Sequence, residues 1–75
     1  MNLCDVLVHI NEALTAEQKG ELEEDMRDLP GVVAPRFNPG QDHLMLVAFN
    51  SDRVNYALLL GRVRAHGYQA QLIGA

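Results

Sequence analysis

The sequence is short of cysteine. Cys4 is the only thiol in the 75 residues, so the chain cannot close an internal disulfide, and it cannot offer two thiolates to a soft metal ion. Because Cys4 lies early in an apolar stretch, we expect a buried and unreactive thiol. Disulfide scaffolds, and thiolate metal sites built by one chain alone, are therefore excluded.

Basic residues are also scarce. Six lysine and arginine residues stand against ten aspartate and glutamate residues, which gives a formal net charge of −4. Nucleic-acid binding needs a basic surface that neutralises phosphates. We therefore expect no nucleic-acid partner.

Long hydrophobic runs are missing as well. The apolar run from Leu3 to Ile10 is interrupted by Asp5 and is far shorter than the roughly 20 residues of a transmembrane helix. No basic segment precedes it, as a signal peptide would require. We expect no membrane partner and a cytoplasmic protein in which residues 1–75 form a single domain, either on its own or as a module of a larger protein.

Groups that would support catalysis are not found. The sequence has no serine or cysteine with a plausible base, no glycine-rich phosphate loop and no HxxxH pair. We therefore expect that the chain is not an enzyme and that it carries no cofactor.

What the sequence does have is regular apolar patterning. Alternation places Val6, Val8 and Ile10 on one face of a first strand. A capping box, Thr15-x-x-Gln18, predicts the start of the first helix. The expected elements are strands at 3–10, 32–38, 43–49 and 68–73 and helices at 15–28 and 56–66.

The order β-α-β-β-α-β predicts the fold class. It is typical of the ferredoxin-like α+β sandwich, a four-stranded antiparallel sheet with two helices on one face. Pro35 predicts an edge position for the second strand, since proline cannot donate to a ladder, and Gly61 suggests close packing of the second helix on a neighbour. The expected core is Val6, Val8, Ile10, Leu22, Met26, Leu29, Phe37, Val47, Phe49, Leu59, Val63 and Leu72.

Three short motifs resemble the heavy-metal-associated domain of copper chaperones and metal-pump tails. They are Leu29-Pro30-Gly31-Val32 after the first helix, Phe37-Asn38 at the end of the second strand, and Ala65-His66-Gly67-Tyr68 before the last strand. The resemblance runs from about Val6 to Leu72. It implies the same ferredoxin-like fold.

The loop before the first helix departs from that family. The family holds a soft ion such as Cu(I) with a Gly-Met-x-Cys-x-x-Cys loop. Here Glu12 and Ala13 stand at the glycine and methionine positions, and Thr15 and Gln18 at the two cysteine positions. A hydroxyl and an amide are weak ligands for a soft ion, so the resemblance transfers no metal role to this loop.

The sheet face away from the helices is the first candidate site. Strand parity places Leu7, Leu44 and Leu46 there, and large exposed aliphatic residues side by side usually mark an interface. A register shift of one residue would bury them instead. The leading hypothesis is a domain that has lost the thiolate site and serves in protein interaction or oligomerisation, with a protein partner or a second copy on this face.

Three histidines support the alternative. His9 ends the first strand, His43 opens the third and His66 closes the second helix, so the topology places all three toward one end of the sheet, with Glu12 and Asp42. Imidazole and carboxylate suit Zn(II), Ni(II) or Cu(II). The alternative function is heavy-metal binding or transfer, with a zinc or copper ion held by these histidines or by a partner's thiols. Unrelated surface histidines are the simpler interpretation.

Overall fold

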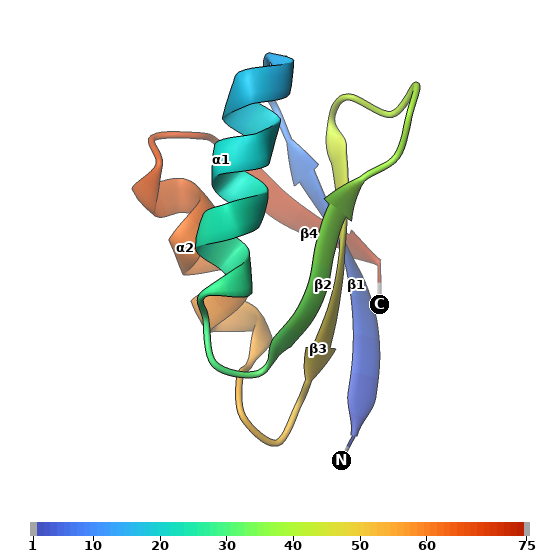
Figure 1. Cartoon of the computed structure of the whole chain (residues 1–75), viewed down its shortest axis with the longest axis vertical. Helices are drawn as coiled ribbons and strands as arrows, with labels where there is room; N and C mark the ends of the chain where they lie inside the picture. The colour runs from blue at the N-terminus through green and yellow to red at the C-terminus, as the bar shows by residue number, and fades with distance from the viewer. Residues whose placement is uncertain (1, 75) are drawn as a thin grey trace.

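The elements follow the order expected from the sequence. The computed structural model describes residues 2–74, which form one four-stranded antiparallel sheet in the order β2-β3-β1-β4. Both helices lie on the same face of this sheet (Figure 1). The ferredoxin-like α+β class is confirmed. The elements are β1 (Leu3–Ile10), α1 (Ala16–Arg27), β2 (Val32–Phe37), β3 (Leu44–Asn50), α2 (Tyr56–Ala65) and β4 (Ala70–Gly74).

Side-chain caps fix where the two helices begin. Thr15 Oγ1 accepts a hydrogen bond from the Gln18 N–H at 3.1 Å, and Gln18 Oε1 accepts one from the Thr15 N–H at 2.9 Å. At the start of α2, Asn55 Oδ1 accepts from the Leu58 N–H at 2.9 Å. Each cap satisfies backbone donors that have no partner in the first helical turn. The predicted capping box is confirmed.

The last strand begins later than the sequence suggested. Gly67 has a φ of 91°. This left-handed conformation is common just after the end of a helix, and glycine adopts it most easily. The Gln69 N–H then donates to the Glu12 carboxylate instead of a strand partner. For this reason β4 starts at Ala70 and not at Tyr68.

The core fills the space between the sheet and the helices. Strand parity and the inner stripes of α1 and α2 account for most of it, as expected. Of the expected core, Leu29, Phe37 and Leu72 are only partly buried. The buried hydrophobic residues are Val6, Val8, Ile10, Leu14, Leu22, Met26, Met45, Val47, Phe49, Val54, Leu59, Val63 and Ala70.

Gly61 does not serve close packing. A Cβ atom built on Gly61 meets no atom within 4 Å, and the residue is exposed. The expectation of close packing is wrong, because Leu59 and Val63 form the buried stripe of α2 and Gly61 faces solvent between them.

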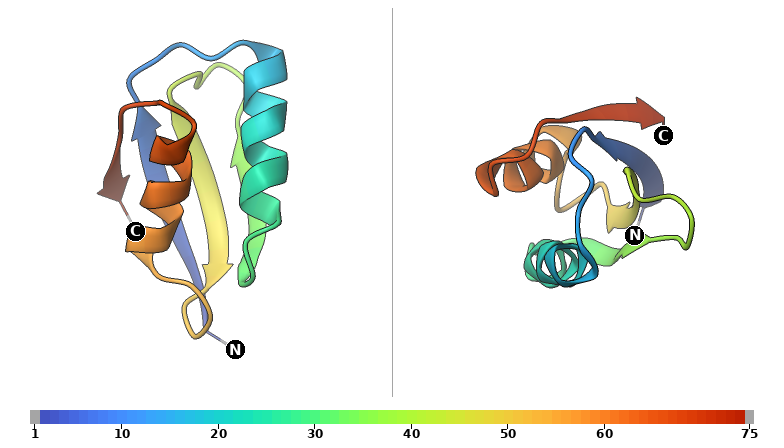
Figure 2. Two further views of the ribbon diagram at one scale, coloured as in Figure 1. Left: turned by 90° about the vertical axis from the view of Figure 1, so that its left-hand side faces the viewer. Right: turned by 90° about the horizontal axis from the view of Figure 1, so that it is seen from above.

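One end of the sheet gathers three connections. The β1–α1, β2–β3 and α2–β4 connections all lie at the top of Figure 1, as the topology predicted. Figure 2 shows the two helices together on one side of the sheet, so no helix covers the other face. Among residues 2–74, none of the helices has the length and apolar character needed to cross a membrane.

Candidate functional site

The β1–α1 loop uses its polar side chains to hold the fold. Thr15 and Gln18 are both engaged in the helix cap. The Glu12 carboxylate accepts the Gln69 N–H with both oxygens, at 2.9 and 3.2 Å. Leu14 anchors the loop in the core at 7% exposure. This loop is therefore a structural turn whose polar groups already have partners.

Two of the three candidate histidines lie together. The rings of His9 and His43 are stacked, with centroids 5.8 Å apart and planes 18° from parallel. His43 Nδ1 lies 2.8 Å from the Ile10 carbonyl oxygen. In the neutral ring this carbonyl requires the proton on Nδ1 and leaves a lone pair on Nε2. His9 Nδ1 is buried and finds no hydrogen-bond partner within residues 2–74.

His66 is held by a different set of groups. Its Nε2 lies 2.8 Å from Asp25 Oδ2, and its ring stacks on Tyr68 with centroids 5.9 Å apart. Arg62 donates to the other oxygen of Asp25 at 2.9 Å. His66 and Arg62 together hold the pKa of Asp25 below its usual value. This cluster links α2 to α1 across their outer surfaces.

The structure does not bring His66 to the other two histidines. Between residues 2 and 74, no group of three or more His, Cys, Asp or Glu side chains is placed to hold one metal ion. Asp42, expected near such a site, forms an ion pair with Lys19 at 2.6 Å, and this contact lowers the pKa of Asp42. Lys19 also lies over the Phe37 ring, 5.6 Å from its centroid. The carboxylates at this end of the sheet therefore have partners of their own.

The candidate interface residues lie on the uncovered face of the sheet. In the β1–β3 ladder Leu7 pairs with Leu46, and His9 pairs with Leu44. All four side chains are partly exposed, whereas their neighbours in each strand are buried. The inward and outward positions of β1 and β3 are therefore the predicted ones.

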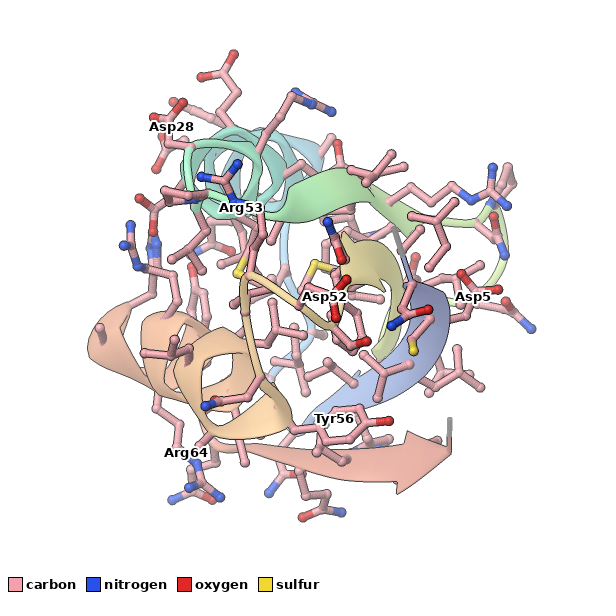
Figure 3. All side chains as sticks on the ribbon, turned by 90° about the horizontal axis from the view of Figure 1, so that it is seen from below. Asp5, Asp28, Asp52, Arg53, Tyr56 and Arg64 are labelled. Carbon is pink, nitrogen blue, oxygen red and sulfur yellow. The ribbon has the colours of Figure 1, made fainter. Side chains whose placement is uncertain are left out.

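Two opposite charges flank these leucines, and sequence reasoning missed them. Arg36 of β2 pairs with Leu46, and Asp5 of β1 pairs with Ala48, so both share the outward side of their partners. Figure 3 shows Asp5 projecting from β1 on the side opposite the helices. Both residues are exposed, and neither is in a salt bridge within the part of the chain that the structure describes.

Both edge strands have backbone groups that are already occupied. On β2, Glu23 of α1 accepts the Phe37 N–H at 2.9 Å, and Pro35 has no N–H to offer. On β4, Arg64 donates to the Ala70 carbonyl from two nitrogens, at 3.2 and 2.9 Å. Edges blocked in this way are poor templates for an added strand.

Comparison with solved structures identifies the fold. The chain is similar to the copper binding domain from HMA7, a P-type ATPase, with 16% identity over 93% of each chain and a TM-score of 0.83. It is similar to oxidised MerP from Ralstonia metallidurans CH34, with 11% identity over 95% of this chain and 97% of that one and a TM-score of 0.82.

A third similar structure is the N-terminal domain of a potential copper-translocating P-type ATPase from Bacillus subtilis, described in its Cu(I)-loaded state. Its identity to this chain is 20%, over 93% of this chain and 86% of that one, with a TM-score of 0.83. No protein-family model and no curated protein matches the sequence. These likenesses confirm the fold that the sequence motifs implied.

Proposed function

We propose that this chain is an oligomerisation module in which the uncovered sheet face binds a second copy of the same chain. The proposal rests on one observation: Leu7 and Leu46 lie side by side, with Leu44 next along β3, on a face that no helix covers. Contiguous apolar residues on an exposed surface usually mark an interaction site. The backbone groups of β2 and β4 that are already occupied make these edges poorer templates for an added strand, which favours the face as the surface of association.

The charges on the face favour a second copy as the occupant. Asp5 and Arg36 carry opposite charge: Arg36 of β2 is opposite Leu46, and Asp5 lies two residues before Leu7 on β1. A two-fold dimer presents the same patch from both chains. If the two-fold axis lies midway between Asp5 and Arg36, it brings Arg36 of each chain opposite Asp5 of the other chain. The dimer then contains two pairs of opposite charge. The face is balanced in charge, whereas the whole chain is acidic at −4, so contacts elsewhere would be more repulsive.

Sedimentation velocity over a range of concentrations tests this proposal. We expect the parent chain to form a dimer, and Leu46→Glu to shift it to monomer because a carboxylate would be desolvated in the interface. Leu58→Glu is the matched control: Leu58 is 53% exposed on α2, on the other side of the molecule. It should leave the dimer intact. A parent that stays monomeric at every concentration contradicts the proposal.

A second candidate function is metal handling. Two of the similar structures are described as copper-binding or copper-translocating, and the stacked rings of His9 and His43 offer two imidazoles here. A zinc or copper ion would then be held by imidazoles or by a partner's thiols. Titration of the reduced protein with Cu(I) and with Zn(II), read by native mass spectrometry, tests this function. In either role we expect the domain to act in the cytoplasm and to catalyse no reaction.

A further inference from the structure

We infer that His9 and His43 form one half of a metal site that two copies of the chain complete across the sheet face. The ion would be a borderline divalent cation such as Zn(II). This inference rests on the proposed dimer and adds a ligand to it. Three features of the described residues support it: the tautomer of His43, the unpartnered nitrogen of His9, and the position of His9 relative to the flanking charges.

His43 is already oriented as a ligand. A histidine that binds a metal through one ring nitrogen usually donates the other N–H to a carbonyl or carboxylate, which fixes the ring. His43 Nδ1 makes this contact with the Ile10 carbonyl at 2.8 Å, and the Ile10 N–H donates to the His43 carbonyl at 2.8 Å. The residue is exposed, so the lone pair of Nε2 is available to an ion.

His9 has no partner that would compete with an ion. Its Nδ1 is buried without a hydrogen bond, which is unfavourable for a polar atom. A half-turn of the ring exchanges Nδ1 with a carbon and so moves the nitrogen out of this buried position. No hydrogen bond has to break in that turn, because within residues 2–74 the His9 ring stacks on His43 and makes no hydrogen bond. A ring nitrogen of His9 is therefore free to become a ligand.

One copy alone cannot complete the site. Zn(II) in structural sites takes four ligands in tetrahedral geometry. Residues 2–74 supply no third His, Cys, Asp or Glu to a common ion. Asp42 is paired with Lys19, and Glu12 is bonded to the Gln69 N–H. Two copies related by a two-fold axis supply four imidazoles, a ligand set that suits Zn(II) and Cu(II).

The position of His9 agrees with the axis that the charges define. On an ideal sheet, with strands about 4.8 Å apart and about 3.4 Å per residue, the register places His9 about 14 Å from Asp5 and about 12 Å from Arg36. His9 is thus almost equidistant from the two, and lies within about 2 Å of the axis that exchanges them. Facing sheets are about 10 Å apart, a gap that two imidazole side chains span.

The test is sedimentation velocity of the full chain with Zn(II) or with EDTA, and native mass spectrometry for stoichiometry. We expect one zinc ion per two chains, and dimer formation at a chain concentration at least tenfold lower with Zn(II). His9→Gln and His43→Gln should each abolish the zinc effect. His66→Gln, at a histidine that is paired with Asp25, is the matched control and should keep it. Circular dichroism checks that each variant is folded. If one of His9→Gln and His43→Gln does not fold, the other alone is enough to test the site.

The outcomes separate this inference from the proposed function. A dimer that forms equally with and without Zn(II) overturns the metal site and leaves the sheet-face dimer standing. One zinc ion bound to a monomer, or a zinc effect that survives both histidine variants, also overturns the site. A zinc-induced dimer that persists in Leu46→Glu places the ion away from the sheet face and contradicts both. A parent that is monomeric with and without Zn(II) overturns both.

Discussion

At the scale of single residues, several side chains hold the loop between β1 and α1. Thr15 and Gln18 cap α1 reciprocally, and the Glu12 carboxylate holds the Gln69 N–H. Leu14 is buried beneath them. Each of these contacts stabilises the fold and leaves the loop without a free donor set. The loop thus contributes stability, while the candidate binding groups lie on the sheet face.

Loss of the cap at Thr15 should cost stability only. We expect Thr15→Ala to lower the free energy of unfolding by about 0.5–2 kcal/mol, since the Gln18 N–H loses its acceptor. Urea denaturation followed by circular dichroism measures this change. Zinc binding should be the same in the variant and the parent. A loss of tight zinc binding would show that Thr15 does more than cap the helix.

Replacing Gly61, in contrast to Thr15, should increase the stability of the chain. Its position in α2 is exposed, and a Cβ atom there meets nothing within 4 Å. Gly61→Ala should therefore raise the free energy of unfolding by about 1 kcal/mol through helix propensity alone. Gly31→Ala is the contrasting variant, since Gly31 has a φ of 101° and a Cβ there would lie 2.8 Å from the Arg53 Cβ. It should destabilise the chain, and equal effects at both sites would contradict this account.

At the scale of elements, the outer surface of α1 is more than a solvated acidic face. Asp25 accepts from Arg62 at 2.9 Å and contacts His66 at 2.8 Å, so it joins α1 to α2. Glu23 accepts the Phe37 N–H and so joins α1 to β2. These two carboxylates connect elements, which a helical-wheel pattern does not reveal.

The Asp25 contacts predict a pH dependence of stability. The pKa of Asp25 is lowered from its ordinary 3.8, first by His66 and also by Arg62. The folded state therefore favours the carboxylate. The resulting stabilisation, about 0.2–1 kcal/mol for a pair of this exposure, is present above pH 3.8 and is lost as the pH falls through the lowered folded pKa.

Asp25→Asn tests this dependence. The variant should be less stable than the parent at pH 6, and the difference should shrink as the pH is lowered toward 3. Thermal unfolding across this range measures it. Glu24→Gln is the control, at an exposed position of α1 that is in no salt bridge within residues 2–74. If the difference in stability between Asp25→Asn and the parent were the same at every pH, the stabilising role of the Asp25 carboxylate would be contradicted.

The sequence predicted the features that are set by residues close to one another in the chain. The period of two placed Val6 and Leu7 on opposite faces correctly, and the Thr15 cap depends on residues three apart. The position of the His66 side chain, in contrast, depends on a residue far away in the sequence. Topology predicted the end of the sheet for His66, but the direction of its ring is set by Asp25, 41 positions away in the chain. Such a contact leaves no periodic or local signal in the sequence.

At the scale of the whole molecule, the two faces of the sheet differ in what covers them. The helices cover one face and build the core, while the other face carries Leu7, Leu44 and Leu46, with Asp5 beside Leu7 along β1 and Arg36 opposite Leu46 on β2. The central claim is that a second copy covers this face in a two-fold arrangement. In that arrangement each Arg36 lies opposite the aspartate at position 5 of the other chain.

The most direct test mixes two charge-reversed variants. Asp5→Arg alone places like charges opposite each other in both pairs, and so does Arg36→Asp alone, so each variant should dimerise at least about tenfold more weakly than the parent. In a heterodimer of the two variants every charge again meets its opposite. Sedimentation equilibrium of an equimolar mixture should therefore show dimers at concentrations where each variant alone is monomeric. A mixture that stays monomeric, or single variants that dimerise like the parent, would contradict the account.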